Sequence, residues 1–156
     1  MTVTVATGVA IAAAPDVVWA AIERIDTHTG WMRDAERITY CSERHEGVGA
    51  EFECRTRVGP LRTDDRFVVT RWEPGVCMGI EHRGAVTGAG EFRLRPLAGG
   101  AGTWFVWDEQ LRFPGRLGGA VGERLARPVL RRVWAGNLRR LRALVEARED
   151  RRVSGR

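Results

Sequence analysis

The sequence predicts an α+β fold in which a curved antiparallel sheet of seven strands closes over one long C-terminal helix. Three features predict it: an alternating N-terminal strand, six strand-like segments between residues 36 and 113, and a long helical pattern after Pro114. The 156 residues, 44% of them hydrophobic, suffice for one domain with its own core. We expect that domain to span residues 1–147, and residues 148–156 to form a charged, flexible tail.

A strand and two short helices are predicted at the N-terminus. The strand has its larger residues at every second position: Val3, Val5, Thr7, Val9 and Ile11. Pro15 and Asp16 then favour a helix start, since proline fits the first turn and a carboxylate suits the positive end of the helix dipole. This helix is expected to end near Asp26. Around Trp31 and Met32 we expect a second short helix or a lid, which would place Trp31 at the mouth of a pocket.

Glycine and proline turn signals divide residues 36–113 into the strands of a meander. Within each strand, charged residues of one parity mark the solvent face, so residues of the other parity face the interior. The inward residues predicted in this way are Phe52, Cys54, Thr56, Val58, Phe67, Val69, Met78, Ile80, His82, Gly90, Phe92, Leu94, Thr103, Phe105, Trp107, Glu109, Leu111 and Phe113. Asp65 and Arg71 share the parity of Phe67, so they form either an ion pair near the interior or solvated strand ends.

The longest element begins after Pro114. Its apolar residues recur mainly at steps of three and four: Val121, Leu125, Val129, Leu130, Val133, Trp134, Leu138, Leu141, Leu144 and Val145. Pro128 removes one backbone donor inside this pattern, so we expect it to bend the helix over the curved sheet. Arginines occupy the outer face of the helix and its margins.

Composition argues against several classes of protein. No run of apolar residues reaches the length of a membrane span, and the N-terminus lacks the basic residues of a signal peptide, which favours a cytoplasmic protein. The pI is 10.3, but all 25 basic residues are arginine. A GC-rich coding sequence explains that bias more simply than phosphate contacts do, so we expect no DNA partner.

The sequence also lacks the spacing of metal and cofactor sites. The three cysteines have no CxxC spacing and indicate reduced thiols. The histidines have no ligand spacing, so no metal is expected, and His28 and His45 are expected in solvent-exposed loops. The glycine-rich stretches lack the Lys-Ser/Thr of a phosphate-binding loop, so we expect turns there and no cofactor.

Three segments carry a resemblance to a known family. They are Ile11-Ala12-Ala13-Ala14-Pro15-Asp16-Val17-Val18-Trp19, Gly30-Trp31-Met32-Arg33-Asp34-Ala35-Glu36, and the Gly-Thr-x-Phe-x-Trp run at residues 102–107. With the order of elements, they make the chain resemble the START-like (Bet v 1-like, SRPBCC) helix-grip superfamily from Val3 to about Glu146, and within it the polyketide cyclase/dehydrase group. This fold hosts cyclases, dehydratases, lipid carriers, receptors and co-chaperone domains, so function must be argued from the site.

The resemblance implies a ligand pocket between the concave face of the sheet and the long helix, with its mouth near Trp31 and its floor at the helix around Pro128. The residues expected in its wall are Trp31, Phe52, Phe67, Met78, Ile80, Phe92, Phe105, Trp107, Leu125, Val129 and Val133. Taken singly, each of them is more typical of a filled core, whereas together in this fold they indicate a cavity. His82 and Glu109 are polar residues of inward parity, so each is either an acid/base group for a ligand or a hydrogen-bonded core residue.

Three functions remain open at this point. The first is a protein that binds a small hydrophobic or aromatic, polyketide- or lipid-like ligand and acts on it as a cyclase or dehydratase through His82 or Glu109. The second is a carrier or sensor that uses the same pocket without chemistry. The third is an interaction module whose arginine-rich helix contacts RNA or a protein partner. The sequence is also compatible with a homodimer.

Overall fold

A computed structural model describes residues 2–155 of the chain. Seven strands form one antiparallel sheet in the order β1-β7-β6-β5-β4-β3-β2. The main elements are β1 (Val3–Ile11), α1 (Pro15–Ile22), the 3-10 helix η1 (Ile25–Gly30), β2 (Ala35–Tyr40), β3 (Glu51–Val58), β4 (Leu61–Glu73), β5 (Cys77–Arg83), β6 (Thr87–Leu97), β7 (Gly102–Arg112) and α2 (Gly119–Ser154). The prediction of a seven-stranded sheet with a long C-terminal helix is therefore confirmed.

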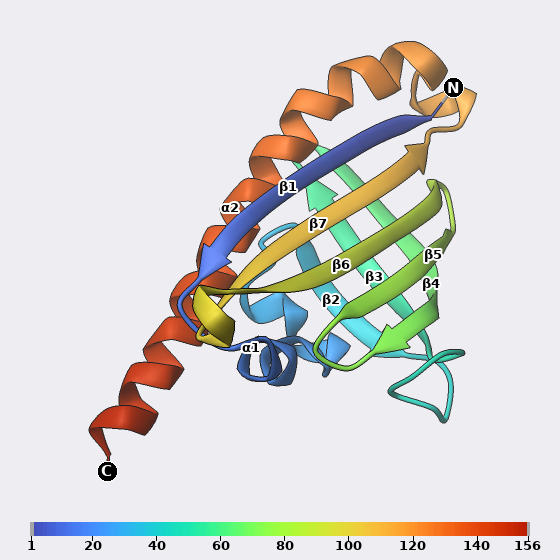
Figure 1. The fold of residues 1–156 in the computed structure, drawn as a ribbon. Helices are drawn as coiled ribbons and strands as arrows, with labels where there is room; N and C mark the ends of the chain where they lie inside the picture. The colour runs from blue at the N-terminus through green and yellow to red at the C-terminus, as the bar shows by residue number, and fades with distance from the viewer. Residues whose placement is uncertain (1, 156) are drawn as a thin grey trace.

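The sheet is a meander from β2 to β7, and β1 joins it beside β7 (Figure 1). The ladder β4–β5 shifts its register between Val69 and Arg71, and the ladder β2–β3 shifts between Ala35 and Arg37. Such irregularities increase the local twist and bend a strand, which helps the sheet to curve. Figure 1 shows this curved sheet with α2 running alongside β1.

The segment between β1 and β2 differs from its prediction in detail. The helix α1 ends at Ile22, and the second short helix is η1, which precedes Trp31 and includes His28. His28 is 4% exposed, so the expectation of a solvent-exposed loop residue is wrong. Its Nε2 donates a hydrogen bond of 2.7 Å to the carbonyl oxygen of Ile22, the last residue of α1. This contact holds the ring inside the domain.

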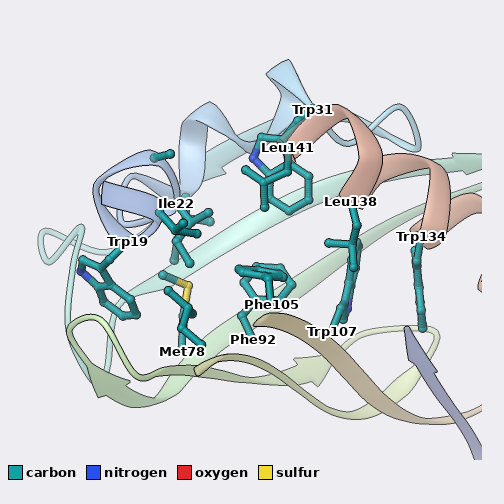
Figure 2. Close-up of a cluster of buried hydrophobic side chains, with 14 of the residues drawn as sticks. Trp19, Ile22, Trp31, Met78, Phe92, Phe105, Trp107, Trp134, Leu138 and Leu141 are labelled. Atoms are coloured by element: carbon teal, nitrogen blue, oxygen red, sulfur yellow. The ribbon is translucent and has the colours of Figure 1, made fainter. Parts of the chain in front are cut away.

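The middle of α2 forms the core with the sheet. Trp134, Leu138 and Leu141 are buried, and Figure 2 shows these side chains pointing toward the aromatic residues of the strands. Trp134 stacks on Trp107 of β7 with ring centroids 4.8 Å apart. These contacts fix α2 across the concave side of the sheet.

The two ends of α2 are more exposed. Between Gly119 and Leu130 only Glu123 is buried, and its Oε1 accepts a hydrogen bond of 3.1 Å from the backbone N–H of Phe113. At the other end, residues 148–154 continue the helix, where a tail was predicted, and most of them are exposed. Figure 1 shows this end projecting beyond the sheet. No helix within residues 2–155 is long and apolar enough to span a membrane.

Candidate functional site

A cavity of about 420 Å³ lies between the concave face of the sheet and α2. Ten of the predicted site residues line it: Phe52, Phe67, Met78, Ile80, His82, Phe92, Trp107, Glu109, Leu125 and Val129. The remaining three, Trp31, Phe105 and Val133, do not line it. Phe105 is fully buried in the core, and Val133 packs against the core beside Trp134, which lines the cavity instead.

The mouth and the floor of the pocket are not where they were predicted. Trp31 is 2% exposed and lies against the rings of Phe92 and Trp107, so it is a core residue and not a gate. The most exposed lining residues are instead Leu125 (68%) and Val129 (48%) of α2. The helix around Pro128 therefore borders the mouth, where a floor was predicted.

His82 and Glu109 meet on the wall of the cavity. His82 lies on β5 and Glu109 on β7, and both side chains face inward as strand parity predicted. The His82 Nε2 atom is 3.5 Å from Glu109 Oε2, and the side chains are 10% and 6% exposed. Trp107 Nε1 donates a hydrogen bond of 2.9 Å to the other carboxylate oxygen, Oε1, which orients it. Within the described residues His82 Nε2 has no hydrogen-bond partner.

Gly90 makes room for this carboxyl group. It lies on β6 opposite Glu109, between β5 and β7. A Cβ atom at this position would lie 2.7 Å from Glu109 Cγ and 2.9 Å from its Oε1, closer than side chains approach one another. Because Gly90 has no side chain, the Glu109 side chain can extend across β6 toward His82 on β5.

Asp34 is a pocket residue that the sequence patterns did not reveal. It precedes β2, lines the cavity and accepts a hydrogen bond of 2.6 Å from Asn137 Nδ2 of α2. Burial raises the pKa of its carboxyl group, and the nearby Glu109 carboxylate adds to this effect, while the bond from Asn137 opposes it. Alternation could not reveal Asp34, since it lies outside a strand and 103 residues from its partner.

Asn137 connects Asp34 to a wider network. It is fully buried, and its Oδ1 accepts hydrogen bonds from the backbone N–H of Arg33 at 3.1 Å and from Arg140 Nη2 at 3.0 Å. Arg140 also donates through Nε to the carbonyl oxygen of Trp31 at 3.2 Å. In the sequence, Asn137 falls within an apolar helical pattern that gives it no role. Asn137 and Arg140 together join α2 to the segment before β2.

Asp65 and Arg71 are separated by the bulge in β4. Asp65 is buried, lines the cavity and accepts a hydrogen bond of 2.5 Å from the backbone N–H of Ala85. Beyond the register shift, the side chain of Arg71 is exposed, and its Nε donates a hydrogen bond of 2.7 Å to Glu73 Oε1. The two residues therefore form no ion pair, because one extra residue reverses the parity between them.

His28 and Cys54 also line the cavity. Burial lowers the pKa of His28 to about 4, against the smaller opposing effects of its bond to Ile22 and of Asp26. Burial raises the pKa of the Cys54 thiol to about 11, so this thiol stays protonated and is a poor nucleophile. Across residues 2–155, no three or more His, Cys, Asp or Glu side chains are grouped to hold a metal ion.

Solved structures share the fold of this chain. The Thermus thermophilus protein TTHA0849 is 14% identical, with a TM-score of 0.76 over 92% of this chain and 97% of its own. The aromatase/cyclase Zhui from Streptomyces sp. R1128 is 20% identical, with a TM-score of 0.71 over 98% and 96%. The di-domain aromatase/cyclase StfQ of the steffimycin biosynthetic pathway is 18% identical, with a TM-score of 0.78 over 96% of this chain and 52% of its own. At these identities the likeness shows the helix-grip fold alone.

No curated protein matches this sequence closely enough to suggest a more specific role. A family model described as "Polyketide cyclase / dehydrase and lipid transport" matches residues 2–146, almost the whole chain. This match covers the sheet, the cavity and the part of α2 that closes it. The chain therefore belongs to the polyketide cyclase/dehydrase and lipid transport family.

Proposed function

We propose that the protein binds a small hydrophobic, ring-bearing ligand of polyketide-like or lipid-like character in this cavity. The observation that carries the proposal is an apolar cavity of about 420 Å³ with a His82–Glu109 couple on its wall. Ligand sites are commonly apolar, measure several hundred Å³ and contain a few polar groups that fix orientation. Aromatic residues such as Phe67, Phe92 and Trp107 offer faces and edges to a planar ligand.

We also propose that the His82–Glu109 couple catalyses the dehydration of a bound β-hydroxy ketone. One member of the couple takes the α-proton, and the other gives a proton to the departing hydroxyl group, so that an enone and water are formed. The 3.5 Å separation allows both groups to reach neighbouring atoms of one ligand. The family description and the aromatase/cyclase neighbours favour this reaction class.

Binding is tested with the neutral fluorescent probe N-phenyl-1-naphthylamine. We expect saturable binding of one probe per chain, and we expect Ile80→Trp to weaken it about tenfold or more by filling the cavity. Thr39→Trp adds the same side chain on the exposed face of β2 and serves as the control. Equal affinity in both variants, with unchanged melting temperatures, would reject the cavity as the binding site.

Catalysis is tested with 4-hydroxy-4-phenyl-2-butanone, whose dehydration to an enone is followed by absorbance. We expect His82→Ala and Glu109→Gln each to reduce turnover about 100-fold or more, the usual effect of losing an acid/base group. Affinity for the neutral probe should change much less. If the wild-type protein binds the probe but dehydrates no β-hydroxy ketone, the chain is a carrier or sensor.

Other expectations remain predictions. A cytoplasmic location is supported by the three cysteines, which form no disulfide in the part of the chain that the structure describes. A homodimer and a contact between the arginines of α2 and RNA or a protein are further predictions. Sedimentation of the purified protein and binding of RNA at several salt concentrations test them.

A further inference from the structure

The polar groups of the cavity have a charge pattern opposite to that of the whole chain. The chain has a formal net charge of +5, and all its 25 basic side chains are arginine. Yet no arginine among residues 2–155 lines the cavity, whereas three carboxyl groups do so from the concave side: Asp34, Asp65 and Glu109. Glu91 also borders the cavity, but its carboxylate forms ion pairs with two exposed arginines, Arg71 at 3.7 Å and Arg93 at 4.0 Å.

These carboxyl groups are held by hydrogen-bond donors that carry no charge. Glu109 accepts from Trp107, Asp65 accepts from the backbone N–H of Ala85, and Asp34 accepts from Asn137. The Asp34 carboxyl lies near enough to Glu109 for the Glu109 charge to act on it. Arg140 does not line the cavity; it donates a hydrogen bond to Asn137, and its charge partly opposes the rise in the pKa of Asp34. Within the described residues, the cavity wall therefore has three carboxyl groups as acceptors and no arginine to balance them, with His82 as the neighbour of Glu109.

The cavity wall also has one buried polar atom without a hydrogen-bond partner among the described residues. The His82 side chain is 10% exposed, lines the cavity, and its Nε2 atom has no hydrogen-bond partner in the described part of the chain. A ligand hydroxyl can complete this site, because a hydroxyl both donates and accepts. A ligand carboxylate would be placed near Glu109 in a region of low dielectric, where like charges repel more strongly than in water.

We propose that the cavity selects ligands by charge: it takes an apolar molecule with an uncharged or cationic hydrogen-bond-donating group, such as a phenol, alcohol or amine, and rejects a free carboxylate. This inference rests on the proposed function, because it names the class of ligand for the same cavity. Fatty acids and other free carboxylic acids are thereby excluded as ligands whose head group enters the cavity. Hydroxylated ring systems are favoured.

The test compares three ligands that share one ring system: 2-naphthylmethanol, 2-naphthylmethylamine and 2-naphthoate. Binding of each ligand is measured by its competition with N-phenyl-1-naphthylamine near neutral pH in about 0.5 M salt. This salt concentration screens the charges of the surface arginines more than the charges of groups in the cavity. We expect the alcohol and the amine to bind, and 2-naphthoate to bind about tenfold or more weakly than the alcohol. In the Glu109→Gln variant, the affinities for 2-naphthylmethanol and 2-naphthoate should lie closer together than in the wild type.

Glu53→Gln is the matched control, since it removes the same charge from an exposed position on the outer face of β3. It should leave the ratio unchanged. Equal or tighter binding of 2-naphthoate to the wild-type protein overturns the charge selection while the proposed function stands. Should neither the probe nor any of the three ligands bind, the proposed function fails, and the charge selection fails with it.

Discussion

Single residues decide how the carboxyl group of Glu109 lies in the cavity. Its position depends on Gly90, which leaves space on the strand between β5 and β7, and on Trp107, which donates a hydrogen bond to it. His82 then lies 3.5 Å from the free carboxylate oxygen. A glycine within a strand offers no side chain to pack, and here that absence serves the close approach of another group.

Gly90→Ala is expected to displace Glu109, because the new Cβ would lie 2.7 Å from Glu109 Cγ. We expect a loss of about 1–3 kcal/mol in the free energy of unfolding from overpacking, together with reduced dehydration of the β-hydroxy ketone. Denaturant unfolding and the absorbance assay measure the two effects. Gly30→Ala is the control, since a Cβ there meets no atom within 4 Å. Wild-type turnover in the Gly90→Ala variant would show that the placement of Glu109 is unimportant.

His28 makes the stability of the protein dependent on pH. Its pKa is about 4 in the folded protein and 6.5 when the ring is in water, so the unfolded chain binds the proton more readily between these values. The contribution of neutral His28 to the free energy of unfolding is complete above about pH 6.5. It falls as the pH decreases toward 4, by about 3 kcal/mol in total.

The measurement is the free energy of unfolding of the wild type and of His28→Gln between pH 7 and about pH 4, where the slope of each curve reports the protons taken up on unfolding. The wild type should lose more stability over this range than His28→Gln does. Exposed His45 provides the control, and His45→Gln should follow the wild type. Parallel curves for wild type and His28→Gln would mean that His28 does not titrate as proposed.

At the scale of elements, α2 has three parts with different surroundings. Its first three turns are mostly exposed and border the mouth of the cavity, its middle packs on the sheet through Trp134, Leu138 and Leu141, and its last turns project from the domain. Helical periodicity predicted this helix, but it cannot tell which part of an apolar face another element covers. Leu125 and Val129 fit the pattern as well as Leu138 does, yet they are exposed.

Strand alternation was a better guide than helical periodicity for the cavity. It correctly predicts that His82 and Glu109 lie on the same inner face, because a strand alternates strictly unless a bulge interrupts it. It failed for Arg71 because of the register shift after Val69. Asp34 and His28 lie outside the strands, so only their tertiary contacts with Asn137 and Ile22 identify them as buried pocket residues.

Removal of residues 148–156 should leave the domain intact. Most of the residues in the last turns of α2 are exposed, so we expect a change of less than about 0.5 kcal/mol in the free energy of unfolding. Leu141→Ala, in the fully buried part of the same helix, should cost about 2–5 kcal/mol. Denaturant unfolding of both variants gives the comparison. A large loss of stability on truncation would place the C-terminal boundary of the domain beyond residue 147.

At the scale of the whole molecule, the curved sheet and α2 together form one container. The aromatic stack of Trp107 on Trp134 joins them inside, and the exposed residues Leu125 and Val129 border the opening. The chain encloses apolar space there instead of filling it with side chains. A packed interior has few voids larger than a water molecule, so a cavity of about 420 Å³ indicates a ligand site more than a packing defect.

The most direct test of a ligand site inside the domain locates a bound ligand by NMR, using methyl-labelled isoleucine and valine residues and 2-naphthylmethanol. Ile80 lines the cavity, whereas Val121 is 70% exposed on α2 and does not line it. We predict intermolecular NOEs from the naphthyl ring to the Ile80 methyl groups and none to those of Val121. NOEs to Val121 with none to Ile80 would place the ligand on the surface and contradict a ligand site in the cavity.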